Sequence, residues 1–218
     1  MKRVQYLGTR YSAFYLFTFG WSFRAAGWEN VPRSGPVLLV ANHQSLMDPP
    51  LVGLAANRPL TYLARHDLWK NPWLGRLISL YGAVPIDRGF GKDGLQTVLR
   101  LLDQGRAVLM FPEGERTTDG AISPLKPGVS LLVKRLKCPI VPVGIAGAFE
   151  AWPRNRKRPH FDPLVLGSRG RGIAVAFGKA VGPEHWIGAD RDAIVGKLDS
   201  AIAEAHRTAK RIRRKQRD

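Results

Sequence analysis

The chain has 218 residues, of which 44% are hydrophobic, so it is long enough for one α/β domain with its own core and a second domain is not expected. Its 34 Lys and Arg against 17 Asp and Glu give a formal net charge of +17, which favours nucleic acids or anionic membrane surfaces as partners. The single cysteine, Cys138, excludes an internal disulfide and suits a reducing compartment.

Residues 1–26 predict an N-terminal membrane-associated helix. The run YSAFYLFTFGWSF contains seven aromatic residues among thirteen. Arg10 and Arg24 flank this run, which is therefore shorter than the roughly 20 apolar residues that span a bilayer. Tyr and Trp favour the headgroup region, so we expect a helix that lies in the membrane interface. A cleaved signal peptide and a helix packed on the protein's own core are the alternatives.

The first candidate site follows an expected strand in the segment VLLVANHQSLMDPP, residues 37–50. The apolar run Val37–Ala41 predicts a buried strand, and the polar Asn42 and His43 follow it directly. In an α/β sheet, ligands bind outside the carboxyl ends of the strands. We therefore expect the chemistry of the protein at this edge of the sheet.

Asp48 is the expected partner of His43. Two prolines follow Asp48, so this residue is predicted as the N-cap of a helix that extends to about Asn57. His43 would then lie on the preceding loop, within reach of the carboxylate. Such a carboxylate fixes the imidazole tautomer and stabilises the imidazolium, which makes His43 a candidate general base. A solvated His–Asp pair is the alternative.

The rest of the chain alternates strands with helices, which predicts a single α/β domain with a mostly parallel sheet flanked by helices. Further strands are expected at 61–64, 83–87, 106–111, 139–145 and 172–177, and helices at 68–81, 95–103, from about 129 to 137 and at 190–210. Pro85 restricts its strand to a sheet edge or a bulge. The helix at 68–81 carries Trp69 and Trp73, which favour core packing or a second membrane contact. The irregular segment 149–171 and the tail KRIRRKQR are basic and suit an anionic surface.

Two further strand ends carry candidate binding residues. Arg88 follows the strand at 83–87, and its guanidinium could pair with two phosphate oxygens, although a surface arginine is the alternative. Glu113 and Arg116 follow the strand at 106–111, and Gly114 between them allows close approach by a substrate. The motif GFGKDG at 89–94 has the spacing of a dinucleotide-binding loop, but the preceding strand ends in charged residues, so we expect a flexible loop.

Four blocks in the same order resemble the glycerolipid acyltransferases, a family that includes the bacterial 1-acyl-glycerol-3-phosphate acyltransferases. NHQSLMD is similar to the first block, N-H-x-x-x-x-D, and GAVPIDR, FPEGERT and VPVGI are similar to the second, third and fourth. The blocks span about residues 37–145. One block would be weak evidence, whereas four in register are a specific resemblance.

The resemblance implies roles for individual residues. His43 and Asp48 would be catalytic, and Arg88 and Arg116 would bind the phosphate of the acceptor. The positions that would bind or orient substrate are Asn42, Glu113, Gly114, Thr117 and Lys126. The chain departs from the family pattern at Glu115, where a small residue is usual, and at Thr117, where serine is usual. An extra carboxylate beside a phosphate site puts the identity of the acceptor in doubt.

The resemblance implies transfer of a fatty acyl group from acyl-CoA or acyl-carrier protein to the sn-2 hydroxyl of 1-acyl-glycerol-3-phosphate, giving phosphatidate. Residues 27–218 would form the acyltransferase domain, at the cytoplasmic face of the inner membrane. No cofactor or metal is expected, because no His or Cys pair has ligand spacing. Another lysolipid acceptor, such as a lyso-ornithine lipid, is one alternative. A nucleic-acid-binding module is a second, although no recognition motif is present and no nucleic acid is expected.

Overall fold

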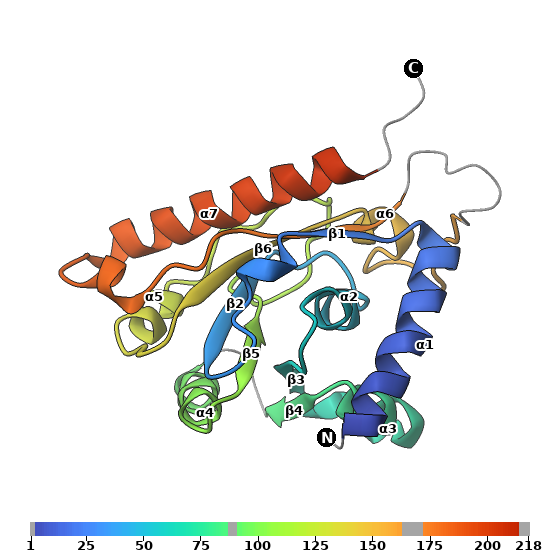
Figure 1. The fold of residues 1–218 in the computed structure, drawn as a ribbon, viewed down its shortest axis with the longest axis horizontal. Helices are drawn as coiled ribbons and strands as arrows, with labels where there is room; N and C mark the ends of the chain where they lie inside the picture. The colour runs from blue at the N-terminus through green and yellow to red at the C-terminus, as the bar shows by residue number, and fades with distance from the viewer. Residues whose placement is uncertain (1–2, 87–90, 163–171, 214–218) are drawn as a thin grey trace.

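The computed structural model describes residues 3–86, 91–162 and 172–213, which form a sheet with helices on both faces (Figure 1). The strands are β1 (Arg24–Ala26), β2 (Val37–Ala41), β3 (Thr61–Arg65), β4 (Ala83–Ile86), β5 (Ala107–Met110), β6 (Ile140–Ala146) and β7 (Ala174–Phe177). The helices are α1 (Arg3–Trp21), α2 (Asp48–Ala55), α3 (Pro72–Leu80), α4 (Lys92–Asp103), α5 (Gly128–Val133), α6 (Ala148–Ala151) and α7 (Arg191–Ile212).

The described part of the chain contains a seven-stranded sheet in the order β1-β7-β6-β2-β5-β3-β4. The five strands from β6 to β4 are parallel, whereas β7 is antiparallel to β6 and β1 is parallel to β7. The predicted α/β fold with a mostly parallel sheet is thus confirmed. Strand β1 was not predicted, because its three residues, RAA, carry no periodic signal, and its pairing with β7 makes the end of the segment 1–26 part of the sheet.

Strand β2 lies in the centre of the sheet, and all five of its residues are buried. Side chains alternate between the two faces of a strand, so both faces must be covered when every residue is apolar. Leu39 packs with the cluster beneath α1 and α2, and Leu38 packs with residues of α4, α5 and α7. Figure 1 shows the same three layers, with α1 and α2 on one side of the sheet and α4, α5 and α7 on the other.

Two prolines lie where the sequence allows them. Pro85 lies in β4, which is the edge strand next to β3, so its missing N–H breaks no hydrogen bond inside the sheet. The helix predicted at 68–81 is instead a 3₁₀ turn at His66–Lys70 followed by α3. The interruption occurs because the Asn71 side chain caps α3 and Pro72 occupies its first turn.

Helix α1 has one face in the core and one face in solvent. Ala13, Phe17 and Trp21, spaced four residues apart, are buried against the cluster that also holds residues of α2. Its exposed large hydrophobic residues are Tyr11, Phe14, Tyr15, Leu16 and Phe19. Among the described residues, none of the helices is both long and apolar enough to cross a membrane. The alternative of a helix packed on the protein's own core therefore holds for the buried face of α1. Its exposed face has no partner among the described residues.

Helix α7 lies directly on β6 at Gly144. A Cβ at this position would lie 2.1 Å from both the Ala205 carbonyl carbon and the His206 amide nitrogen. The buried His206 side chain donates from Nδ1 to the Ile145 carbonyl at 2.8 Å. Burial and the nearby positive charge of Lys210 lower the pKa of His206, so its neutral form is favoured. The fourth sequence block, VPVGI, therefore contains the glycine that allows this helix to approach the sheet.

Replacing Gly144 with alanine should destabilise the fold by about 2–3 kcal/mol, because the new methyl group overlaps the backbone of α7. The measurement is urea unfolding of the full chain. Gly196→Ala in the same helix is the control, since a Cβ there meets nothing within 4 Å and alanine should stabilise the helix by about 0.5–1 kcal/mol. Equal stabilities of the two variants would contradict the close approach.

Candidate active site

The carboxyl ends of β2 and β6 are joined through Asn42. Its Nδ2 donates to the Ile145 carbonyl at 3.0 Å, and its Oδ1 accepts from the Ile145 amide at 2.7 Å. His206 donates to the same carbonyl. Asn42 is only 1% exposed. Both polar ends of its side chain therefore bond to backbone, and this contact fixes the point at which the loop carrying His43 leaves the sheet.

The predicted pairing of His43 with Asp48 is present in the structure. His43 Nδ1 lies 2.7 Å from Asp48 Oδ2, and the same oxygen accepts from the amides of Gln44 at 2.6 Å and Ser45 at 2.7 Å. The carboxylate accepts every one of these bonds, so we assign the imidazole hydrogen to Nδ1. This assignment leaves the lone pair of Nε2 to accept a proton.

The predicted N-cap role of Asp48 is wrong. Met47 is the N-cap residue of α2 and makes no side-chain cap, and Asp48 is the first helical residue. Its fully buried carboxylate is turned to the preceding loop, where it satisfies two amides and the imidazole. The loop is thereby wrapped around the carboxylate, which explains how two residues five positions apart meet.

Phe111 supports the other side of the imidazole. Its ring stacks on that of His43 with centroids 4.0 Å apart and planes inclined by 17°. The stacking and the bond to Asp48 together restrict the ring, which is 18% exposed. Sequence reasoning did not assign Phe111 to the site, although its place at the end of the expected strand and the start of FPEGERT was a usable signal.

Glu113 holds two loops of the site together. Its Oε1 accepts from the His43 amide at 2.6 Å and its Oε2 accepts from the Ser123 amide at 2.8 Å. The side chain is 1% exposed. Burial raises the pKa of Glu113, and these two backbone hydrogen bonds act in the opposite direction. In this structure both carboxylate oxygens face backbone amides, and the predicted contact with substrate stays a prediction.

The segment 113–126 closes around the histidine loop. Thr117 is buried, and its amide donates to the His43 carbonyl at 2.9 Å. Gln44 Nε2 donates to the Gly120 carbonyl at 3.2 Å. Gly114 has φ +81°, a conformation that favours glycine, and a Cβ there would lie 3.2 Å from carbons of the Lys126 side chain. These contacts bring Gly114, Thr117 and Lys126 into the same loop cluster as His43.

Of the two predicted phosphate ligands, the structure describes Arg116 but not Arg88. Burial lowers the pKa of Arg116, the charge of Arg154 lowers it further, and Asp48 acts in the opposite sense. Arg116 directly precedes Thr117, whose amide bonds to the His43 carbonyl, so its backbone lies beside the histidine loop. Arg88 lies outside the described residues, so its role stays a prediction. Gly89 and Phe90 of the motif GFGKDG also lie outside them, whereas Gly91 is the N-cap of α4 and Lys92–Gly94 form its first turn, so the expected loop is wrong for this half of the motif.

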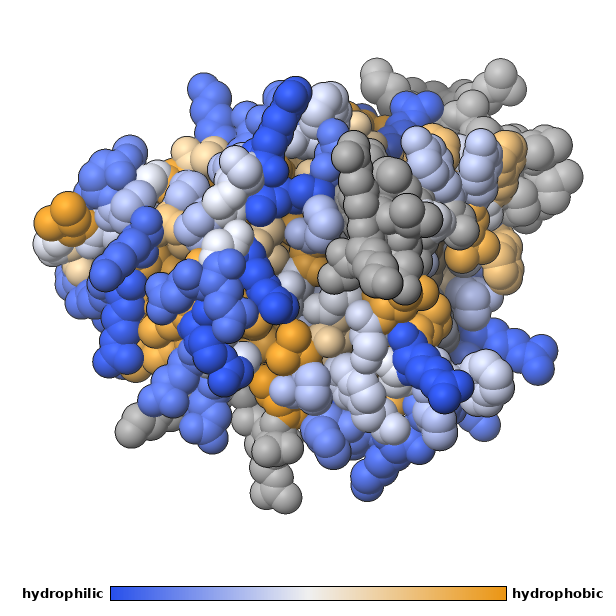
Figure 2. Space-filling model, turned by 60° about the horizontal axis from the view of Figure 1, so that its bottom comes forward, coloured by the Kyte–Doolittle hydropathy of each residue, from blue (hydrophilic) through white to orange (hydrophobic). Residues whose placement is uncertain are grey.

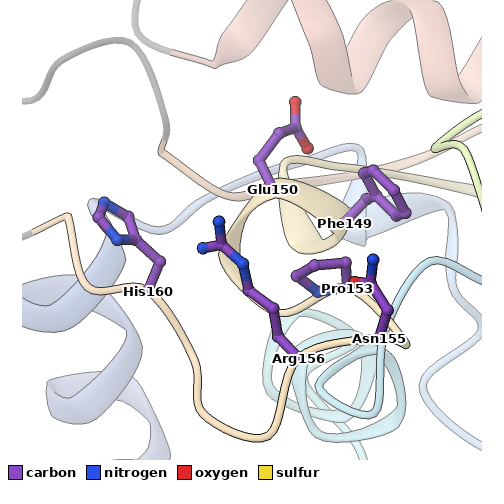
Figure 3. Close-up of a pocket in the computed structure, with 6 residues that line it drawn as sticks. All are labelled: Phe149, Glu150, Pro153, Asn155, Arg156 and His160. Atoms are coloured by element: carbon purple, nitrogen blue, oxygen red, sulfur yellow. The ribbon is translucent and has the colours of Figure 1, made fainter.

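A pocket of about 410 Å³ lies on α6 and the loop that follows it. Its lining residues are Phe149, Glu150, Pro153, Asn155, Arg156 and His160. Figure 3 shows the Arg156 guanidinium between the side chains of His160 and Glu150. Phe149 also lies close to Gly120, because a Cβ on that glycine would be 3.0 Å from its ring. The Gly120 carbonyl in turn accepts from Gln44, the residue after His43. Within the described ranges, no group of three or more His, Cys, Asp or Glu side chains could hold a metal ion.

Comparison with known proteins places this geometry in a family. The acyltransferase family model matches residues 22–146. A probable 1-acyl-sn-glycerol-3-phosphate acyltransferase of Mycoplasma genitalium is 31% identical over 188 residues, which cover 83% of this chain and 69% of that protein. The 1-acyl-sn-glycerol-3-phosphate acyltransferase of Bacillus subtilis is 30% identical over 121 residues, which cover 55% of this chain and 60% of that protein.

The fold also matches a solved structure. The crystal structure of the 1-acyl-sn-glycerophosphate acyltransferase PlsC from Thermotoga maritima superposes with a TM-score of 0.72 at 21% identity, covering 99% of this chain and 81% of that chain. The family match includes the strand, loop and helix that bring His43 to Asp48, together with the segment around Glu113. The chain therefore belongs to the acyltransferase family.

Proposed function

We propose that this protein transfers a fatty acyl group from a thioester donor, acyl-CoA or acyl-carrier protein, to the sn-2 hydroxyl of 1-acyl-glycerol-3-phosphate, giving phosphatidate. The observation that carries the proposal is the 2.7 Å contact between His43 Nδ1 and Asp48 Oδ2, in a loop built around that carboxylate. The names of relatives such as the Mycoplasma genitalium and Bacillus subtilis enzymes support the choice of acceptor.

In this mechanism, His43 Nε2 takes the proton of the acceptor hydroxyl while the hydroxyl oxygen attacks the thioester carbonyl. Asp48 stabilises the imidazolium that forms, because its carboxylate already bonds to Nδ1. The tetrahedral intermediate then expels the thiolate, which takes the proton from the imidazolium. General base catalysis of this kind contributes about 10²- to 10⁴-fold in rate. No covalent enzyme intermediate is required.

The acceptor phosphate would bind near Arg116. Arg116 is partly buried and directly precedes Thr117, whose amide bonds to the His43 carbonyl, so a phosphate bound there would place the rest of the acceptor near His43. Arg88 is proposed as a further ligand on the basis of the family resemblance. The proposal covers a donor thioester of either coenzyme A or acyl-carrier protein.

The protein is proposed to bind the anionic surface of the inner membrane, at the cytoplasmic face, without spanning it. The outer face of α1 exposes five large hydrophobic residues, and α3 exposes Trp73 to 80%. Figure 2 shows hydrophobic residues exposed among strongly hydrophilic ones on one face of the molecule. Aromatic side chains at the headgroup level, combined with a net charge of +17, fit a peripheral interaction with anionic lipid.

Changing His43 to alanine should lower kcat by about 10²- to 10⁴-fold, because the general base is removed. Asp48→Asn should also lower kcat. Its carbonyl oxygen can keep the bonds to Nδ1 and to the amides of Gln44 and Ser45, but the neutral amide stabilises the imidazolium less than the carboxylate does. The assay uses lysophosphatidate and palmitoyl-CoA and follows free thiol and phosphatidate. Micelle binding should be unchanged in His43→Ala, and full activity of that variant would end the mechanism.

Changing Glu113 to glutamine should destabilise the fold by about 1–3 kcal/mol and lower kcat, because the new amide group must face one of two backbone donors. Urea unfolding and steady-state kinetics measure the two effects. Glu184→Gln, an exposed carboxylate, serves as control and should change neither quantity. Unchanged stability of the Glu113 variant would show that its carboxylate does not brace the loops.

Replacing Phe14, Tyr15 and Phe19 together with serine should weaken binding to anionic liposomes by about tenfold or more, because exposed aromatic area is lost. Liposome sedimentation measures binding, and a DNA shift assay in parallel tests the nucleic-acid alternative. Ile187→Ser is the matched control, since Ile187 is 83% exposed and lies just before α7. Equal loss in both variants would argue against a membrane role of α1.

A further inference from the structure

An ion pair lies next to Arg116. Arg154 Nη1 is 3.0 Å from Glu115 Oε2, and the two side chains are 48% and 63% exposed. Glu115 is one of the two residues that depart from the pattern of the family, and Arg154 comes from the loop after α6, 39 residues further along the chain. The extra carboxylate thus has its own cationic partner, which no sequence block predicted.

The backbone around Arg154 is fastened to the catalytic loop. Ser45, whose amide donates to Asp48, also donates from Oγ to the Trp152 carbonyl at 2.9 Å. Trp152 Nε1 donates to the Arg156 carbonyl at 3.0 Å, which closes the turn that carries Arg154. Two hydrogen bonds therefore fix the position of this turn relative to the His43–Asp48 pair.

Arg154 pairs with Glu115, the residue directly before Arg116, so the two arginines belong to the same part of the site. The positive charge of Arg154 contributes to lowering the pKa of Arg116, after the larger effect of burial. The negative charge of Asp48 acts on the pKa of Arg116 in the opposite sense. Two guanidinium groups in this arrangement favour an anion between them.

We infer that Arg154 is a second ligand for the acceptor's phosphate, and that Glu115 occupies Arg154 until a phosphomonoester replaces it. This inference rests on the proposed function. A phosphomonoester carries a charge of about −1.5 to −2 at pH 7 and offers three acceptor oxygens, whereas Glu115 offers one charge. An ion pair between exposed side chains contributes little to stability, so the exchange costs little.

The exchange makes Glu115 a selectivity residue. A headgroup with one negative charge or none competes poorly with a carboxylate already bound to Arg154. A dianionic phosphate gains from both arginines. The carboxylate that put the identity of the acceptor in doubt would thus act against competing headgroups.

The test compares Arg154→Ala, Glu115→Gln and the double variant in the full chain. With lysophosphatidate, Arg154→Ala should raise KM about 5- to 20-fold with kcat within about twofold, as for loss of a charge-assisted hydrogen bond at a partly exposed site. Glu115→Gln should lower KM about 2- to 5-fold, because Arg154 is released. The double variant should match Arg154→Ala, since Glu115 acts through Arg154.

A matched pair on α7 controls for net charge. Arg207 and Glu204 form an exposed ion pair, so Arg207→Ala and Glu204→Gln change the charge of the protein equally but should leave KM unchanged. The inference is overturned if the control pair shifts KM as much as the test pair. It is also overturned if Arg154→Ala and Glu115→Gln shift KM in the same direction, as expected of a pair that only braces the loop.

Binding without turnover separates this inference from the proposed function. Nonionic detergent micelles that contain lysophosphatidate or lysophosphatidylcholine are titrated with each variant. The dissociation constant should shift in opposite directions for Arg154→Ala and Glu115→Gln with lysophosphatidate micelles, and should not shift with lysophosphatidylcholine micelles. This result would support the phosphate site even if the wild type shows no acyl transfer. Active wild type without those opposite shifts would leave the proposed function standing and overturn the inference.

Discussion

The site depends on one buried carboxylate. Asp48 Oδ2 accepts hydrogen bonds from the amides of Gln44 and Ser45 and bonds to the His43 imidazole, all at 2.6–2.7 Å. An ionised carboxylate buried without such partners would be costly, so the loop and the carboxylate stabilise each other. The arrangement that organises the loop also sets the tautomer of the histidine, which links the local fold to the proposed base catalysis.

The loop that carries His43 is held by residues from three other parts of the chain. Glu113 and Thr117, from the segment after β5, bond to the backbone amide and carbonyl of His43. Asn42 bonds to Ile145 in β6, and His206 in α7 bonds to the same residue. The imidazole is thus positioned by rigid elements. Residues that family resemblance associates with substrate, such as Asn42 and Glu113, are seen here holding the backbone that presents His43.

The positive charge of the chain matters both for the whole molecule and for one proposed site. The net charge of +17 and the exposed aromatic face of α1 suit an anionic surface, whereas Arg116 and Arg154 are inferred to share a role at the proposed phosphate site. Glu115 balances the charge of Arg154 when no phosphate is present. Attraction to the membrane and selection of the headgroup would then both depend on attraction between positively charged side chains and lipid phosphate.

The sequence by itself determined the α/β fold, the buried strand before His43 and the meeting of His43 with Asp48, because strand periodicity and loop spacing are local. It also restricted Pro85 to an edge strand or a bulge, since proline lacks the donor a central strand needs, and the structure places it on the edge strand β4. It mistook Asp48 for an N-cap and missed β1, because each depends on partners that local patterns do not specify. Only the tertiary structure decided that Glu113 would bridge His43 to Ser123 and that Glu115 would meet Arg154, since contacts between residues far apart in the chain arise from how the layers pack.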